Sequence, residues 1–473
     1  MSTNHVSLLR RRALLSASAG TFLLSLVRPI PSQASQNYRI IAAPGHAPLT
    51  GPKRRATDVW AYDGMVPGPT LRVRQGQPVS ILVENGLDQD TTVHWHGIRL
   101  PIAMDGVPGI SQPPIQPGGR FVYTFTPPDA GTFWYHPHAN TLQQLGRGLA
   151  GALIVEEPVS VPVDRELLWT IMDWRLRPDG QIAGGFGNRM EAAMSGRIGN
   201  TVTINGVVPT TESVRAGERV RIRLVNGALA RIMALRFEGH RPIVVAIDGQ
   251  PCDPHEPPGD HLMLGPAMRA DVVLDLQGKA GQRYRVIDDY DKDLAYTLVE
   301  LAYDSGPPVR RHPPDAPLRL SRNPVPVPDL ASAERRLLVL QGGMMGGMGG
   351  MGGMMGKAIW AINGMSMTGD GQPGMAPVTT LTLGRSYVLT LRNDTAWSHP
   401  MHLHGHSFRV LSRNGAPVPF NQWGDTVLVA PRETVDLAFV ADNPGDWMFH
   451  CHITDHQMAG LMAILRISKG TKG

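Results

Sequence analysis

A unit of sequence occurs three times in this chain of 473 residues. In each copy an Asp-Gly or Asn-Gly turn leads to a second glycine-containing turn, and then to an alternating stretch that ends in asparagine. The first turns begin at Asp63, Asn205 and Asn363, and the alternating stretches are 79–85, 220–226 and 387–393. Alternation with period two is typical of a β-strand with one buried face. The repeat therefore predicts three related β-sandwiches.

The composition agrees with an all-β chain. Its 53 glycines and 41 prolines imply many turns, and no long stretch has helical periodicity. We expect a first domain at 35–158, a second at 159–305 and a third at 331–473. Residues 306–330 are rich in proline and charge and predict a linker, while residues 342–356 form a low-complexity Gly/Met loop.

Residues 1–34 have the features of an export signal. Arg10, Arg11 and Arg12 precede an apolar run, 13–27, that is too short to span a membrane, and small residues follow it. The arginines resemble a twin-arginine signal, and an ordinary secretory signal is the alternative. We therefore expect a periplasmic protein.

Charge gives no reason to expect a nucleic-acid partner. The formal charge is +5, and the leader holds four arginines and no acidic residue, so the mature chain would carry 5 − 4 = +1. No later segment predicts a membrane span, and we expect a monomer.

Ten of the 17 histidines fall in four motifs, and these lie only in the first and third copies of the repeat. Eight of them form His-x-His pairs: His94 and His96, His136 and His138, His402 and His404, and His450 and His452. Period-two spacing puts both members of a pair on one face of a strand. We expect a metal cluster between the first and third domains, with no ligands from the second.

Cys451 lies between two of these histidines. Because strand side chains alternate, Cys451 points away from His450 and His452, which predicts metal centres on both sides of one strand. With His399 and His456 it completes a His₂Cys set, which is typical of blue-copper electron transfer, with zinc as the alternative metal. Cys252, the other cysteine, is expected to be a packed small residue.

The four motifs closely resemble those of the multicopper oxidase family: His-x-His-Gly, His-x-His, His-x-x-His-x-His and His-Cys-His-x-x-x-His. The resemblance covers essentially the whole mature chain and implies three consecutive cupredoxin-like Greek-key β-sandwich domains. It implies four copper ions that reduce dioxygen to water. Type 1 copper would be held by His399, Cys451 and His456, type 2 by His94 and His402, and the type 3 pair by His96, His136, His138, His404, His450 and His452.

Three further positions follow from the resemblance. Leu461 stands at the axial position of type 1 copper, where many bacterial relatives have methionine, and Met462 is one residue later. Asp105 matches an acidic proton relay near the cluster, although an Asp-Gly pair also suits a plain turn. Gln457 stands where some relatives have a second acid. His406 is expected to lie beside the cluster or in solvent rather than bind metal.

The electron donor has two candidates. Thioethers suit Cu(I), so Met344, Met345, Met348, Met351, Met354 and Met355 could collect it, as in bacterial cuprous oxidases, or the loop could be a flexible linker. Thr395 and Trp397 replace the Asp and Met that those relatives use. Another metal ion could take the place of Cu(I), whereas a phenol or aromatic amine would instead reach the edge of His456, as in a broad-specificity laccase.

Three other interpretations compete with an oxidase. A periplasmic copper-binding or tolerance protein without turnover would not need the paired histidines. A structural relative that has lost its coppers would lack these ligands. A copper nitrite reductase would have two sandwiches and a simpler second site. His46, His240, His255, His261 and His312 follow no pattern.

Overall fold

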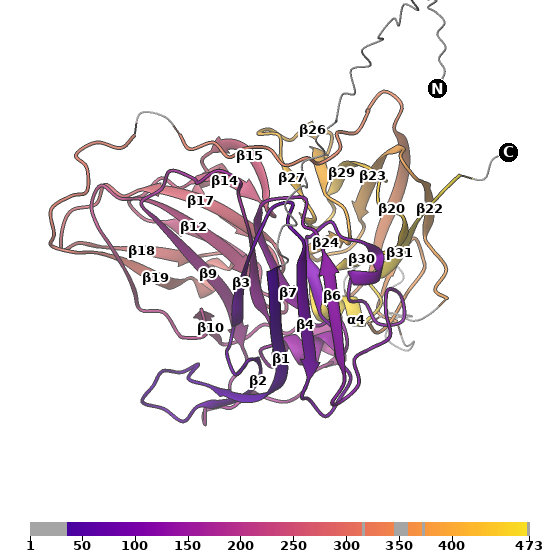
Figure 1. The fold of residues 1–473 in the computed structure, drawn as a ribbon, viewed down its shortest axis with the longest axis horizontal. Helices are drawn as coiled ribbons and strands as arrows, with labels where there is room; N and C mark the ends of the chain where they lie inside the picture. Colours follow the sequence, from indigo (N-terminus) through magenta and orange to yellow (C-terminus); the bar gives the residue numbers. More distant parts are fainter. Residues whose placement is uncertain (1–35, 315–316, 345–357, 371–373, 471–473) are drawn as a thin grey trace, which may run out of the picture. The chain divides into compact units, whose positions relative to one another are not determined.

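The computed structural model describes residues 36–314, 317–344, 358–370 and 374–470. The strands form six sheets, which follow one another along the chain in three pairs. In Figure 1 they gather as an indigo-to-purple, a pink and an orange-to-yellow group. We call these the first, second and third sheet pairs. The predicted all-β fold is confirmed.

The first sheet pair spans residues 36–156. One sheet has the order β2 (Thr57–Tyr62), β1 (Gln36–Ala47), β4 (Val79–Asn85), β6 (Arg120–Phe125). The other has the order β3 (Gly68–Arg74), β8 (Gly151–Glu156), β7 (Gly131–His136), β5 (His94–His96). Two short helices, η1 (Ile102–Met104) and α1 (Thr141–Gly146), lie in its loops.

The second sheet pair spans residues 165–303. One sheet has the order β10 (Thr201–Ile204), β9 (Arg165–Trp174), β12 (Arg219–Asn226), β17 (Arg269–Asp275), β14 (Ile243–Ile247), β15 (Gln250–His255). The other has the order β11 (Thr211–Val214), β19 (Tyr296–Tyr303), β18 (Arg283–Asp288), β13 (Met233–Phe237), β16 (Leu262–Leu264). Its loops contain α2 (Arg189–Ala192), η2 (Pro258–Asp260) and η3 (Lys292–Leu294).

The third sheet pair spans residues 334–468. One sheet has the order β21 (Trp360–Ile362), β20 (Glu334–Gly342), β23 (Ser386–Asn393), β29 (Thr434–Val440), β25 (Phe408–Arg413), β26 (Ala416–Pro417), with β27 (Trp423–Gly424) also paired to β25. The other has the order β22 (Thr379–Thr382), β31 (Met462–Ser468), β30 (Gly445–Cys451), β24 (His399–Leu403), β28 (Thr426–Val429). Helix α4 (Thr454–Met458) follows β30.

The repeated asparagine has the same structural role in every copy. Asn85, Asn226 and Asn393 end strands β4, β12 and β23. Each donates its side-chain amide to a carbonyl group of the loop that follows, at Gln89, Arg231 or Trp397, and accepts the backbone N–H two residues later. These loops lead into β5, β13 and β24, so the asparagine fixes the approach to the strands that carry histidine in two of the copies.

The first turn of each copy is equally regular. Asp63, Asn205 and Asn363 adopt left-handed φ angles of 53°, 51° and 50°. Their side-chain oxygens accept the backbone N–H of Ile41, Thr170 and Val339 respectively. Asp and Asn tolerate this conformation because their short polar side chains bond locally. The sequence repeat is thus a repeat of backbone geometry.

Each sheet pair encloses its own apolar core, with Trp95 in the first, Trp169 in the second and Trp447 in the third. Residues 306–314 and 317–330 contain no helix or strand, as expected of a linker. They are nevertheless packed: Leu318 is buried against β14 and β17, and Asn323 bonds to Ala130.

Two predicted features fall outside the described residues. They are the export signal, 1–34, and most of the Met-rich loop, including Met345, Met348, Met351, Met354 and Met355. Among the residues that the structure describes, no helix has the length and apolar character needed to cross a membrane.

Candidate metal centres

Strand pairing brings the histidine motifs together. In the first sheet pair, β5 pairs with β7 so that His94 lies opposite His136. In the third, β24 pairs with β30 so that His402 lies opposite His450. The same antiparallel register thus places four of the predicted ligands at the ends of two strand pairs. The eight paired histidines are all buried, and we call them the histidine cluster.

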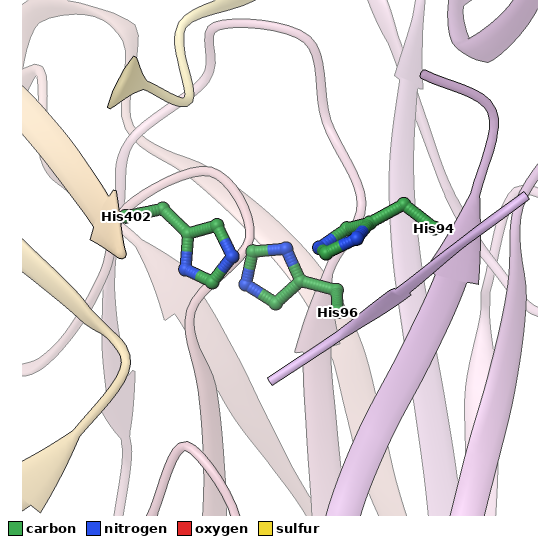
Figure 2. A group of neighbouring side chains, drawn as sticks. All are labelled: His94, His96 and His402. Carbon is green, nitrogen blue, oxygen red and sulfur yellow. The ribbon is translucent and has the colours of Figure 1, made fainter. Parts of the chain in front are cut away.

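His94 and His96 extend from β5 toward His402 on β24, and the three rings converge (Figure 2). The rings of His96 and His402 are stacked, with centroids 3.7 Å apart. One nitrogen from each residue lies within 4.8 Å of the others, so the first and third sheet pairs together offer a three-nitrogen group.

Two further groups complete the histidine cluster. One consists of His96, His136 and His452, and the other of His138, His404 and His450. The Nε2 atoms of His136 and His452 are 3.3 Å apart, and those of His404 and His450 are 3.1 Å apart. Each group again draws on both sheet pairs. His96 belongs to two of the three groups, so those two groups adjoin.

Outward hydrogen bonds determine which ring nitrogen is free. His94 donates Nδ1–H to the carbonyl of Asp105 (2.7 Å), and His402 donates Nδ1–H to the carbonyl of Asp425 (2.9 Å). Their Nε2 atoms are buried without a partner. His96 is held the other way, with Nε2 3.1 Å from the carboxylate of Asp425 and Nδ1 without a partner. Buried nitrogens without partners are costly unless something binds them.

The surroundings favour the uncharged form of the imidazoles in the histidine cluster. Burial, reinforced by the neighbouring rings, lowers the pKa of most of these imidazoles well below the usual value. Neutral imidazole is the form with a free lone pair, and it is the form that binds metal. The protein therefore presents metal donors rather than a set of positive charges.

Asp105, the predicted proton relay, is buried beside the cluster. Its Oδ2 accepts a hydrogen bond from Nδ1 of His404 (2.8 Å), and its Oδ1 is 3.3 Å from Nδ1 of His94. It follows η1, and the next residue, Gly106, has a φ of 80° and lies against Val93. The close approach of Gly106 to the backbone before His94 holds the carboxylate against the cluster. Asp105 is therefore more than a surface turn.

Cys451 lies between His450 and His452 in the chain, and its side chain points to the opposite face of this segment. Its Sγ is 3.5 Å from Nδ1 of His399, on β24, and 3.7 Å from Nδ1 of His456, on α4. We call these three residues the thiolate site; all are fully buried. Trp360 packs against both histidine rings, with centroid distances of 5.0 and 4.5 Å. The predicted division of residues 450–452 between two sites is what the structure shows.

Burial raises the pKa of the Cys451 thiol well above its usual value and lowers that of His456 to about 3. A thiolate in this apolar setting therefore needs a bound cation. Soft sulfur with two neutral imidazoles is a donor set that copper prefers. The residues present fit copper.

Leu461 and Met462 separate as strand alternation predicts. Leu461 packs in the core that contains Cys451, and the backbone N–H of Cys451 donates to its carbonyl (3.0 Å). Met462 points to a different cluster, with Met367 and Met448. The side chain beside the thiolate site is therefore leucine.

A pocket of about 410 Å³ reaches the thiolate site at His456. The third sheet pair supplies Trp397 to its wall, and the second supplies Ile198, Arg231, Asp288, Tyr290, Leu294 and Tyr296. Nε2 of His456 donates to the carbonyl of Met194 (2.8 Å), in the segment after α2. The histidine has no exposed surface of its own, so a donor molecule would meet it through this pocket.

Models of multicopper oxidase domains match residues 46–160, 166–299 and 351–471. The chain is 30% identical to the multicopper oxidase MmcO of Mycobacterium tuberculosis, over 88% of this chain and 84% of that protein. The chain belongs to the multicopper oxidase family. It is therefore a copper-dependent oxidase, and its paired sheets are cupredoxin-like sandwiches.

Solved structures agree. A multicopper oxidase from Pseudomonas thermotolerans superposes with a TM-score of 0.82 at 37% identity, covering 92% of this chain and all of the other. A laccase-like multicopper oxidase, CueO, from Ochrobactrum superposes with a TM-score of 0.78 at 27% identity, covering 92% and 98%. That protein is described as oxidising lignin model compounds and lignosulfonate.

Sequence reasoning missed several residues around the oxidase's sites. Asp425 and Thr426 contact His96 and His402, and Arg269 from the second sheet pair contacts Asp425. No local motif marks them, because each contact joins residues far apart in the chain. Their burial is the only shared feature.

Other expectations have simple outcomes. His406 is buried and donates Nδ1–H to the carbonyl of His404, outside the metal-binding groups found among the described residues. Gln457 is buried, and neither of its amide atoms has a partner in the described structure. Cys252 packs in the second core, where burial raises its pKa to about 12.

Proposed function

We propose that this oxidase binds four copper ions and reduces dioxygen to water. The observation that carries the proposal is that residues 450–452 face two sites at once. The thiolate site would hold type 1 copper through His399, Cys451 and His456. In the histidine cluster, type 2 copper would be held by His94 and His402, and the type 3 pair by His96, His136, His138, His404, His450 and His452.

Copper at these sites would accept single electrons from a donor and deliver four of them to dioxygen. The chain's own contribution is connection and protection. Cys451 is bonded through the backbone to His450 and His452, so a short covalent route joins the two sites. Full burial of both sets of ligands excludes bulk water. Asp105, hydrogen-bonded to His404, is the group we assign to proton delivery.

For the donor, the pocket at His456 favours a small aromatic reductant. Its volume suits a phenol or aryl amine, and Ile232, Ile453 and Trp397 give it apolar walls. Asp288 lines the same pocket, and backbone N–H groups of Ala234 and Tyr290 hold its carboxylate in place. A phenol or aryl amine releases a proton with its electron, so an acceptor in the pocket that reaches the electron-accepting histidine suits this chemistry. The activity described for the Ochrobactrum relative supports the same class.

Oxygen uptake with 2,6-dimethoxyphenol tests the proposal. We expect turnover by wild type and about a tenfold lower kcat/KM for Asp288→Asn, the effect of one hydrogen bond of about 1.4 kcal/mol. Ferrocyanide, which offers no hydrogen to donate, should be oxidised equally by both proteins. Asp291→Asn is the matched control, because Asp291 lines the pocket but lies on its exposed side. Equal phenol kinetics for Asp288→Asn and wild type would contradict the role of Asp288.

Cu(I) is the second candidate donor, and one contact favours it. The first methionine of the Met-rich loop is Met344, whose backbone N–H donates to the carbonyl of Ala193 and whose carbonyl accepts from Trp397 Nε1. Ala193 lies next to Met194, which contacts His456. The loop thus leaves the described structure close to the thiolate site. Neither Thr395 nor Trp397 offers a soft ligand there. Oγ1 of Thr395 is 2.9 Å from Nε2 of His399.

Deleting residues 345–356 separates the two donors. A cuprous oxidase should lose most Cu(I)-dependent oxygen uptake and keep its phenol turnover. If Cu(I) uptake is unchanged while phenol turnover persists, Cu(I) is not collected by the loop. A deletion variant with the same blue absorbance as wild type provides the folding control.

The remaining proposals concern organisation and location. We propose domains at 35–158, 159–305 and 331–473, joined by the linker at 306–330. From the sequence of residues 1–34 and from the family, we propose export to the periplasm by the twin-arginine route. We also propose a monomeric state. N-terminal sequencing of secreted protein and its mass in solution test these two points.

A further inference from the structure

The second sheet pair holds none of the proposed copper ligands, yet one of its side chains bonds to Asp425, which contacts the histidine cluster. Arg269, the first residue of β17, has no exposed surface. Its Nη1 and Nη2 donate to the two carboxylate oxygens of Asp425, at 2.8 and 2.5 Å. This is the bidentate arrangement that a guanidinium group makes best.

Asp425 in turn orients two histidines. Its Oδ1 is 3.1 Å from Nε2 of His96 and 3.2 Å from Nδ1 of His402, and its backbone carbonyl accepts Nδ1–H of His402 at 2.9 Å. These contacts leave Nδ1 of His96 and Nε2 of His402 without partners, directed into the cluster. The carboxylate therefore decides which nitrogen each of the two rings presents.

A second carboxylate of the same sheet pair strengthens the connection. Asp248 accepts the backbone N–H of Arg269 on Oδ1 and that of Thr426 on Oδ2, at 2.9 and 3.0 Å. Its Oδ1 is also 3.3 Å from Nη1 of Arg269. Asp248 thus ties the start of β17 to the backbone beside Asp425, so the arginine and its carboxylate partner cannot separate without breaking several buried bonds.

The first sheet pair leaves room for this contact at Gly97, directly after His96. Gly97 has a φ of 85°, and a Cβ there would collide with Nη2 of Arg269 and Oδ2 of Asp425. The guanidinium also donates Nε–H to the carbonyl of Thr132, on β7. All three sheet pairs therefore meet at one buried ion pair.

We propose that Arg269 is a positioning residue for the histidine cluster: the copper-free second domain fixes Asp425, and through it the rings of His402, a proposed type 2 ligand, and His96, a proposed type 3 ligand. The inference rests on the proposed ligand set. Because metal ligands are held by their outer partners, weakening such a partner costs roughly 10–100-fold in metal affinity. The thiolate site, which Arg269 does not contact, should be unaffected.

Arg269→Lys tests the proposal, since lysine keeps the charge but loses the bidentate contact. Arg221→Lys is the matched control. Arg221 is also fully buried in the second sheet pair and donates to a buried carboxylate, Asp271, but Asp271, unlike Asp425, contacts no proposed ligand. Each purified protein is loaded with copper and examined by metal analysis, electron paramagnetic resonance and chelator titration.

We expect Arg269→Lys to give an altered or weaker type 2 resonance and to lose that copper at a roughly tenfold lower chelator concentration. Its blue absorbance per chain should equal that of wild type, and Arg221→Lys should match wild type in both measurements. Equal type 2 signals and chelator sensitivity in the two variants would overturn the inference. A proportional loss of type 1 and type 2 signals in Arg269→Lys would be loss of the fold, and Asp248→Asn then decides.

Should Arg269→Lys fail to fold, Asp248→Asn replaces it. Asparagine keeps an acceptor for the backbone N–H groups but removes the charge beside Arg269, so the same selective change is expected in weaker form, and its absence overturns the inference. A wild-type protein that binds blue copper but no type 2 copper would instead contradict the proposed ligand set. The two failures are therefore distinguishable.

Discussion

The first and third sheet pairs have the same arrangement of histidines at the ends of β7 and β30, but only the third has a thiolate site. Strands β7 and β30 both lead into a His-x-His segment, in which the second histidine lies just past the strand, and both are followed by a short helix, α1 or α4. Pro137 stands in the first where Cys451 stands in the third. At the sequence offsets that place His399 and His456 around Cys451, the first sheet pair has Thr91 and Leu142.

The first sheet pair fills this space with ordinary packing. Thr91 donates its hydroxyl to Gln144, and Leu142 lies in an apolar cluster with Trp134. The comparison teaches that both sheet pairs share the face that carries the His-x-His side chains, where β7 and β30 end. On the other face, three side chains on a shared backbone form the thiolate site, the proposed type 1 copper site. Four predictions test this division.

The largest effect is expected from Cys451→Ser. Without the thiolate, the blue absorption should vanish, and turnover with any donor should fall by roughly a thousandfold, about 4 kcal/mol on the barrier. The histidine cluster should keep its copper, because its ligands lie on the opposite face. Absorption spectra, oxygen uptake and copper content measure the three effects. A variant that lost all of its copper would show that the two faces are not independent.

Asp105→Asn should act on the histidine face alone. Asparagine can still accept the hydrogen bond from His404 but cannot carry a proton, so we expect reoxidation by dioxygen to slow by about 100-fold. The blue absorbance and the rate of its bleaching by a donor without oxygen should stay as in wild type. Stopped-flow spectroscopy after reduction separates these steps. Unchanged reoxidation would mean that protons arrive by another route.

A smaller effect is expected from Leu461→Met, on the thiolate face. A thioether beside Cys451 stabilises the oxidised metal relative to leucine, so the reduction potential should fall. A fall of roughly 60 mV corresponds to a tenfold change in the equilibrium constant for one electron. Redox titration of the blue band measures it. An unchanged potential would place the introduced sulfur away from the metal.

The smallest effect is expected from Pro137→Ser, the counterpart of Cys451→Ser. Pro137 contributes its backbone carbonyl to Nδ1 of His136, and this contact survives the substitution. We expect wild-type colour, copper content and turnover, with a stability loss of about 1 kcal/mol or less. Thermal unfolding and copper analysis check this. Copper loss comparable to that of Cys451→Ser would remove the asymmetry between the two strand ends.

The sequence predicted what depends on local periodicity. The three copies of the repeat, the opposite faces of Cys451 and its neighbours, and the separation of Leu461 from Met462 follow from turns and strand alternation. The same reasoning located the ten clustered histidines. These features need only a few neighbouring residues to be specified.

Contacts between distant segments could not be predicted in this way. Nothing near Arg269 indicates that its guanidinium meets Asp425, and nothing near Met194 indicates that its carbonyl covers His456. Such contacts depend on how three sheet pairs pack, which local sequence patterns do not reveal. The pocket at His456 is likewise built mainly by the second sheet pair, whose sequence has no ligand motif.

The most direct test of the account is the copper content of fully loaded protein, measured together with its visible spectrum, for wild type and Cys451→Ser. We predict four copper ions per chain and one intense thiolate-to-copper band in wild type, and three ions without the band in the variant. Fewer than four ions in wild type at full occupancy, or a blue band that survives loss of the thiol, would contradict a strand end that serves two metal sites.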